Sequence, residues 1–90
     1  MSNHDKPKIL AVDDVPSNLM IVETILKNSG AEIITASNGN DAWALLLRHK
    51  FAIALLDVQM PGIGGYEIAE MMLEDETNQN TPIIFLTAND

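Results

Sequence analysis

The chain has 90 residues, of which 47% are hydrophobic, and its 13 acidic and 5 basic residues give a net charge of −8. A chain of this length forms one small domain, and this apolar content is ordinary for a folded protein and argues against disorder. The acidity argues against direct binding of nucleic acid, which needs many Lys and Arg residues, and the absence of cysteine excludes disulfides and thiolate metal sites.

The first eight residues, MSNHDKPK, are polar and lack the apolar region of a secretory signal. No apolar run in the sequence approaches the ~18 residues that a membrane-spanning helix needs. We therefore expect a soluble, cytoplasmic domain that does not contact a membrane.

The first predicted elements are a short strand and a helix. Ile9–Val12 is a brief apolar run that ends in two acids, Asp13 and Asp14. Turn and cap residues follow, and the spacing of apolar residues then predicts a helix over Leu19–Asn28, with positions 19, 22 and 26 on one face. Gly30 is a natural stop for that helix.

The remaining elements continue the alternation of strand and helix. The pattern predicts strands at Glu32–Ala36, Phe51–Leu56 and Ile83–Thr87, and helices at Ala42–Lys50 and Tyr66–Glu74. Regular alternation of this kind is typical of an α/β domain with a parallel sheet and right-handed crossovers. No repeat or linker interrupts the pattern, so we expect residues 1–90 to form one domain.

The third predicted strand carries the first candidate functional residue. Phe51–Leu56 is uniformly apolar, as expected for a strand buried on both faces, and it stops at Asp57. The turn residues Met60-Pro61-Gly62 follow, so Asp57 should face a loop at the carboxyl end of the strand, where open α/β sheets bind ligands. The alternative is that Asp57 only caps a turn or the next helix.

Parallel strands bring their carboxyl ends to one edge of the sheet. Asp13 and Asp14 follow the first strand, Asp57 follows the third, and Thr87 ends the fourth. Carboxylates this close repel one another unless a cation is shared among them, and oxygen ligands of this type suit Mg²⁺. Taken singly, Asp13 or Asp14 could simply begin the turn before the first helix.

Three segments of the chain resemble the receiver domain of two-component response regulators: ILAVDDVPSN, LLDVQMPGIGGYE and PIIFLTAND. Their order and spacing agree with that family along the whole chain. The resemblance implies a flavodoxin-like, doubly wound parallel sheet with strand order 2-1-3-4-5. It also implies a signalling domain rather than an enzyme, one that takes a phosphoryl group from a histidine kinase by at most a self-catalysed transfer.

The resemblance also implies the roles of individual residues. Asp57 is the phospho-acceptor, and the hydroxyl of Thr87 contacts the phosphoryl group. The Mg²⁺ ligands are Asp14, Asp57 and the backbone carbonyl of Gln59, while Asp13 acts mainly through water. Ala88 matches the small residue that leaves room for the phosphoryl group.

The sequence departs from the family pattern at two places. Gly64 stands where family members often have Asp, which predicts a looser loop after the third strand. The family's last strand and helix, with a Lys that pairs with the phosphoryl group, have no counterpart in these 90 residues, so the domain is expected to be incomplete at its C-terminus. The strand Ile83–Thr87 is then an open edge, and we expect a homodimer or a domain-swapped partner chain.

Two other functions are weighed against the phospho-acceptor. One is a truncated receiver fragment that binds metal or a partner without completing a phosphorylation cycle. The other is a haloacid-dehalogenase-like phosphatase, which also uses an Asp nucleophile with Mg²⁺. That enzyme would need Asp-x-Asp after the first strand, and Asp13-Asp14-Val15 lacks this pattern.

Overall fold

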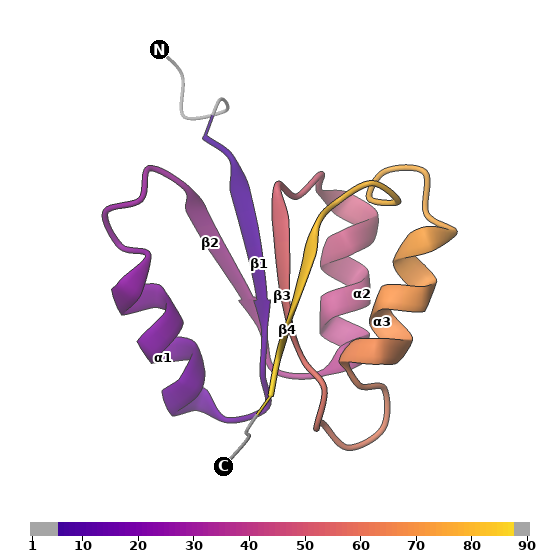
Figure 1. Cartoon of the computed structure of the whole chain (residues 1–90), viewed down its shortest axis with the longest axis horizontal. Helices are drawn as coiled ribbons and strands as arrows, with labels where there is room; N and C mark the ends of the chain where they lie inside the picture. The colour runs from indigo at the N-terminus through magenta and orange to yellow at the C-terminus, as the bar shows by residue number, and fades with distance from the viewer. Residues whose placement is uncertain (1–5, 88–90) are drawn as a thin grey trace.

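A computed structural model of the protein describes residues 6–87. Strands and helices alternate along the chain (Figure 1). The strands are β1 (Lys8–Val12), β2 (Glu32–Ala36), β3 (Ile53–Asp57) and β4 (Ile83–Leu86), and the helices are α1 (Pro16–Ile25), α2 (Gly39–Arg48) and α3 (Gly65–Leu73). None of the helices in the described part of the chain has the length and apolarity needed to cross a membrane.

The four strands form one parallel sheet with the order β2-β1-β3-β4. In the central pair, Leu10 of β1 lies opposite Ala54 of β3, and on the other side Leu10 lies opposite Ile34 of β2. This arrangement confirms the predicted α/β fold and, for these four strands, the predicted order. All the strands point the same way, so their carboxyl ends meet at the lower edge of the sheet in Figure 1.

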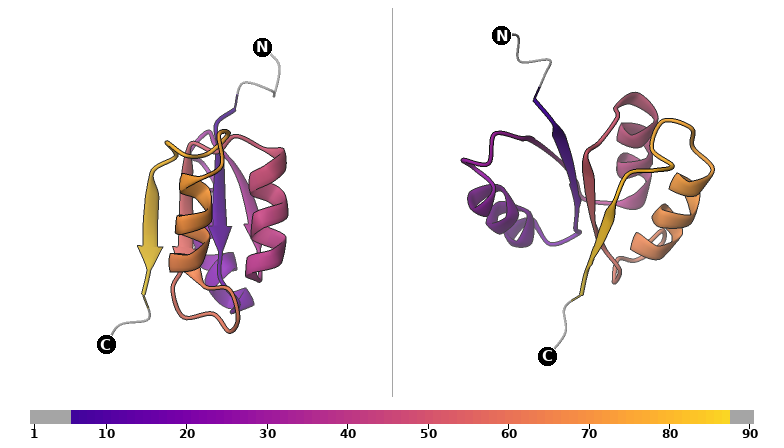
Figure 2. Two further views of the ribbon diagram at one scale, coloured as in Figure 1. Left: turned by 90° about the vertical axis from the view of Figure 1, so that its right-hand side faces the viewer. Right: turned by 45° about the horizontal axis from the view of Figure 1, so that its top comes forward.

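The two faces of the sheet are covered unequally. Helices α2 and α3 lie on one face and α1 lies on the other (Figures 1 and 2). The core lies on the α2 and α3 side, where it includes Leu46, Ile68 and Met72 from the helices. Helix α1 has no fully buried residue, although Leu19, Val22 and Leu26 are half-buried, as their spacing predicts. The α1 face is therefore the more weakly packed one.

Helix α1 begins three residues before the predicted Leu19 and ends at Ile25 rather than Asn28. Its first residue is Pro16, whose fixed φ and missing N–H suit the first position of a helix. The chain then passes through a turn to Gly30, which has a φ of 86° and so adopts the left-handed conformation that favours glycine. The other two helices also begin earlier than predicted, α2 at Gly39 and α3 at Gly65.

The third strand begins at Ile53, two residues later than predicted, and includes Asp57 as its last residue. Phe51 is buried, but its amide donates to the side-chain oxygen of Asn78 at 2.9 Å instead of joining the sheet. Asn78 also donates to the carbonyls of Leu46 and His49, both at 2.8 Å. Asn78 lies in the segment 75–80 between α3 and β4, in which every residue is polar, and it is nevertheless fully buried. Its hydrogen bonds fix the backbone directly before β3.

Candidate functional site

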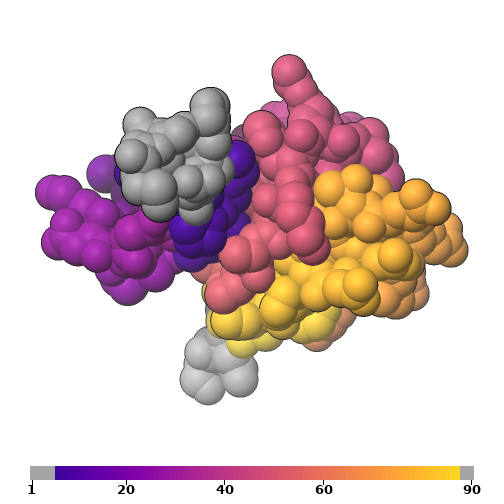
Figure 3. Space-filling model, turned by 90° about the horizontal axis from the view of Figure 1, so that it is seen from above, coloured from indigo at the N-terminus to yellow at the C-terminus, as the bar shows by residue number. Residues whose placement is uncertain are grey.

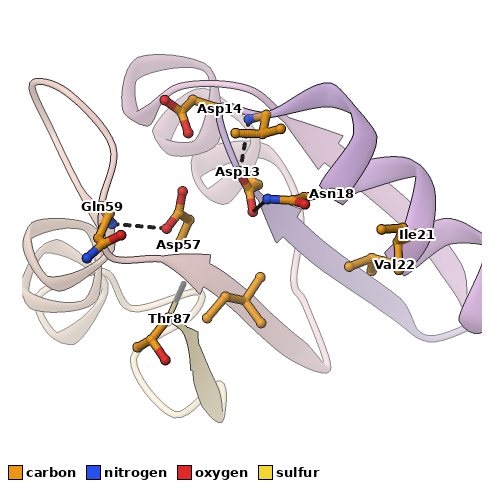
Figure 4. Close-up of a pocket in the computed structure, with 10 residues that line it drawn as sticks. Asp13, Asp14, Asn18, Ile21, Val22, Asp57, Gln59 and Thr87 are labelled. Carbon is orange, nitrogen blue, oxygen red and sulfur yellow. Dashed lines mark hydrogen bonds between the residues drawn. The ribbon is translucent and has the colours of Figure 1, made fainter. Parts of the chain in front are cut away.

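Three carboxylates gather at the carboxyl ends of β1 and β3. Asp13, Asp14 and Asp57 each offer one oxygen, and these oxygens all lie within 4.8 Å of one another. Asp13 and Asp57 are 5% and 7% exposed, while Asp14 is open to solvent. They face a cavity of about 420 Å³, drawn in Figure 4. The structure thus brings together the three acids that the sequence places after two separate strands.

Local backbone contacts hold Asp57 in place. Its Oδ1 accepts the backbone N–H of Gln59 at 3.0 Å, and the next residue, Val58, donates to the carbonyl of Leu86 at 3.2 Å. Helix α3 begins against this point: a Cβ on Gly65 would lie 2.6 Å from the Asp57 carbonyl oxygen. Only glycine permits that approach, so the start of α3 and the end of β3 are fixed relative to each other.

Gly64, where the resemblance predicts a looser loop, is held by the helix that follows. Its backbone N–H donates to Oε1 of Glu67 at 3.0 Å. This contact satisfies one of the free N–H groups at the start of α3, and it places an acid near the positive end of the helix. Glu67 therefore ties down the end of the loop at that position.

The electrostatic environment of Asp57 disfavours its charged form. Burial raises the pKa of Asp57 above its ordinary value, and the negative charges of Asp13 and Asp14 raise it further, while the hydrogen bond from Gln59 opposes these effects. In the folded chain, an ionised Asp57 is consequently an unfavourable group. Anything that supplies positive charge at this point relieves that cost.

Replacing Asp57 with asparagine should stabilise the metal-free chain at neutral pH. A raised folded-state pKa means that the folded chain binds this proton more tightly than the unfolded chain, so stability falls as pH rises through the folded-state pKa of Asp57. The asparagine side chain carries no such cost and can still accept the Gln59 N–H. Thermal unfolding should give Asp57→Asn the higher Tm at neutral pH and nearly the same Tm as the parent below about pH 3.9. A lower Tm for the variant at neutral pH would show that the charge of Asp57 does not destabilise the folded chain.

Thr87 and Gln59, two other predicted site residues, also line the cavity. Thr87 lies just after β4 rather than within it, and Figure 4 shows it below Asp57. Ala88 lies outside the described residues.

Asn18 is a site residue that the sequence pattern does not identify. Its side chain donates to Asp13 Oδ2 at 3.2 Å. The only feature of the sequence that could have indicated this contact is an asparagine in the first turn of a helix that begins three residues after Asp13.

The donor set fits a small, hard cation. Three carboxylates within reach of one point, one of them exposed, offer oxygen atoms only, which suits Mg²⁺ better than a metal that prefers nitrogen or sulfur. The open side of the cavity leaves room for the waters that Mg²⁺ retains. The other residues that line the cavity are partly polar (Asn18, Gln59 and Thr87) and partly apolar (Val15, Ile21, Val22 and Leu86).

Comparison with known sequences matches residues 9–90 to the response regulator receiver domain family. The sensor protein GacS of Pseudomonas syringae is 41% identical over 86 residues, which cover 92% of this chain and 10% of GacS. The response regulator PleD of Caulobacter vibrioides is 36% identical over 83 residues, which cover 92% of this chain and 18% of PleD. The chain therefore spans only a small part of the length of these relatives.

The solved structures that resemble this chain belong to the same family. The chemotaxis protein CheY4 of Vibrio cholerae has a TM-score of 0.87 and 33% identity, covering 94% of this chain and 71% of CheY4. The receiver domain of a Pseudomonas aeruginosa sensor histidine kinase, solved with magnesium in its active site cleft, has a TM-score of 0.86 and 30% identity over 93% and 69% of the two chains. TrrA of Thermotoga maritima, in complex with the histidine kinase ThkA, has a TM-score of 0.80 and 34% identity over 93% and 71%.

Proposed function

Because the chain belongs to the response regulator receiver domain family, we propose that it accepts a phosphoryl group on Asp57 in two-component signalling. The observation that carries this proposal is the position of Asp57 among three carboxylates at the mouth of a cavity. Asp57 is the acid whose backbone is fixed by two neighbouring elements, β4 and α3. Its carboxylate accepts the backbone N–H of Gln59 and lines the cavity, where a phosphoryl group can approach it.

The transfer that we propose uses the carboxylate of Asp57 as nucleophile. One of its oxygens attacks the phosphorus of a phosphohistidine, forming an O–P bond while the P–N bond breaks. The electron pair of that bond goes to the imidazole nitrogen, which takes up a proton. The reacting form of Asp57 is the ionised carboxylate, which has no proton to lose and needs no general base, and a bound cation would favour that form. The chain has to supply positioning and charge neutralisation.

We assign the cation to Asp14, Asp57 and the backbone carbonyl of Gln59, with Asp13 acting through water. Bound Mg²⁺ would supply positive charge to the transferring phosphoryl group. Thr87 lines the same cavity, and we propose that its hydroxyl donates a hydrogen bond to a phosphoryl oxygen once Asp57 is modified. This contact couples the charge at Asp57 to the end of β4.

The experiment that tests this function is incubation of the chain with acetyl phosphate. Intact-mass measurement should find one phosphoryl group per chain when Mg²⁺ is present and none after chelation. Incorporation that does not depend on Mg²⁺, or no incorporation at all, would overturn the proposal.

We propose a histidine kinase as the phosphodonor. The support is that GacS is a sensor protein, that the P. aeruginosa neighbour is part of a sensor histidine kinase, and that TrrA was solved with the kinase ThkA. We also propose that the chain lies in the cytoplasm and binds neither nucleic acid nor a membrane directly.

A second candidate role concerns the outer edge of the sheet. β4 is an edge strand, and its atoms lie at the outside of the molecule in Figure 3. Ile84 and Phe85 are 52% and 39% exposed, and Phe85 is partly covered by Tyr66, with ring centroids 4.8 Å apart. An exposed apolar edge strand is a template for pairing with another chain. We propose that the 90-residue chain associates with a second copy along β4, by edge pairing or by domain swapping.

Sedimentation at micromolar concentration should show this association in the 90-residue chain. Ile84→Lys places a charge on the edge and should shift the population towards the monomer. The matched control is Ile25→Lys, because Ile25 is also exposed, at 73%, but lies on α1. A compact monomer that unfolds cooperatively would show that the edge does not drive association.

A further inference from the structure

The carboxylate of Asp13 is held at both oxygens by the start of α1. Its Oδ1 accepts the backbone N–H of Val15 at 3.0 Å, and its Oδ2 accepts from Nδ2 of Asn18 at 3.2 Å, both drawn in Figure 4. Asp13 is 5% exposed, so these donors replace most of the water that would otherwise hydrate the group. A carboxylate bound at both oxygens has a fixed orientation.

The other two acids of the cluster are less constrained. Within residues 6–87, Asp57 accepts one hydrogen bond from a neighbouring backbone N–H, and the Asp14 carboxylate accepts none. Carboxylate oxygens of Asp13 and Asp57 lie within 4.8 Å of each other, so the two negative charges repel and the orientation of Asp13 matters for the site. Without the amide of Asn18, the Oδ2 side of Asp13 would be free to turn away from Asp57.

Asn18 makes this contact instead of a local one. Helix α1 has Val15 at its N-cap position, with no side-chain cap, and no acid in its first turn. An asparagine at a helix start commonly satisfies the free N–H groups of its own helix. Here its side chain reaches back to Asp13, although Asn18 itself is exposed to solvent. The contact thus links the first turn of α1 directly to the acidic cluster.

We propose that Asn18 is a positioning residue that orients Asp13 towards the cation site. This inference rests on the proposed Mg²⁺ site, and it adds a residue of α1 to it. Hydrogen-bond partners that orient the groups around a metal typically change its affinity by about 10–100-fold when they are removed. Since we expect Asp13 to act through water, the effect of losing Asn18 should lie near the lower end, at about tenfold.

The test is the Mg²⁺ affinity of Asn18→Ala, measured by titration of the Gln59 amide NMR signal, because that amide donates to Asp57. The variant should bind Mg²⁺ about tenfold more weakly. Its Tm without Mg²⁺ should fall only slightly, because the loss of the hydrogen bond to Asp13 is partly offset by the higher helix propensity of Ala. Asn40→Ala is the matched control, an exposed asparagine in the first turn of α2, and should bind as the parent does.

A double-mutant cycle separates positioning from a general structural effect. If Asn18 acts through Asp13, adding Asn18→Ala to Asp13→Ala should cause no further loss of Mg²⁺ affinity. An equal loss in both backgrounds, or parental affinity of the single variant, would overturn the role of Asn18. Failure of the parent chain itself to bind Mg²⁺ would instead overturn the proposed metal site, so the two failures are distinguishable.

Discussion

Asp57→Asn should incorporate no phosphoryl group from acetyl phosphate under conditions in which the parent chain incorporates one. The amide has nearly the same shape as the carboxylate and can keep the hydrogen bond from Gln59, but it is a poor nucleophile towards phosphorus. The expected effect is a complete loss, measured by intact mass in the presence of Mg²⁺. The variant should still fold, because the substitution also removes an unfavourable buried charge.

Two controls make this loss interpretable. The Tm of Asp57→Asn shows whether the fold survives. Asp75→Asn changes a different acid, one that follows α3 and lies outside the cluster of three. It should be labelled as the parent is. Undiminished labelling of Asp57→Asn would mean that another residue is the acceptor.

Asp14→Ala should weaken Mg²⁺ binding by at least about tenfold, which corresponds to roughly 1.4 kcal/mol. Mg²⁺ sites in proteins commonly use only one or two carboxylates, so the loss of one removes a large share of the protein ligands. Asp14 is the exposed member of the cluster, and its removal leaves no buried partner unsatisfied. Calorimetry measures the affinity directly, without relying on Trp43, which lies outside the lining of the cavity.

The control for this variant is Asp41→Ala. Asp41 lies in the first turn of α2, where its carboxylate accepts from Asn38 at 3.0 Å. Removing it changes the net charge of the chain by the same amount as Asp14→Ala, but Asp41 does not belong to the cluster of three acids. If the two variants bound Mg²⁺ equally well, the affinity would reflect overall charge and not the site.

The parts of the fold that follow from periodicity could be predicted from the sequence. The uniformly apolar run before Asp57 and the alternation of elements predict a parallel sheet, and the strands of a parallel sheet have their carboxyl ends at one edge. The proximity of Asp13, Asp14 and Asp57 therefore follows from the direction of the strands alone. Spacing alone also predicts the half-buried positions 19 and 22 of α1 and position 26, directly after its end.

The parts that depend on single hydrogen bonds could not be predicted. Phe51 and Ala52 continue an apolar run, but Phe51 bonds to a side chain 27 residues away, so the strand starts later than its hydrophobicity indicates. Asn78 stands in a polar connector and is nevertheless fully buried. The contact of Asn18 with Asp13 likewise depends on a side-chain orientation, and periodicity carries no signal for it.

The measurement that tests the central claim most directly is the location of the phosphoryl group on the chain. Reduction of an acyl phosphate with borohydride converts the modified aspartate to homoserine, and fragmentation of the resulting peptide by mass spectrometry gives its position. After incubation with acetyl phosphate and Mg²⁺, we expect homoserine at position 57 and at no other acidic position. Homoserine at position 13 or 14, with Asp57 unmodified, would contradict the account.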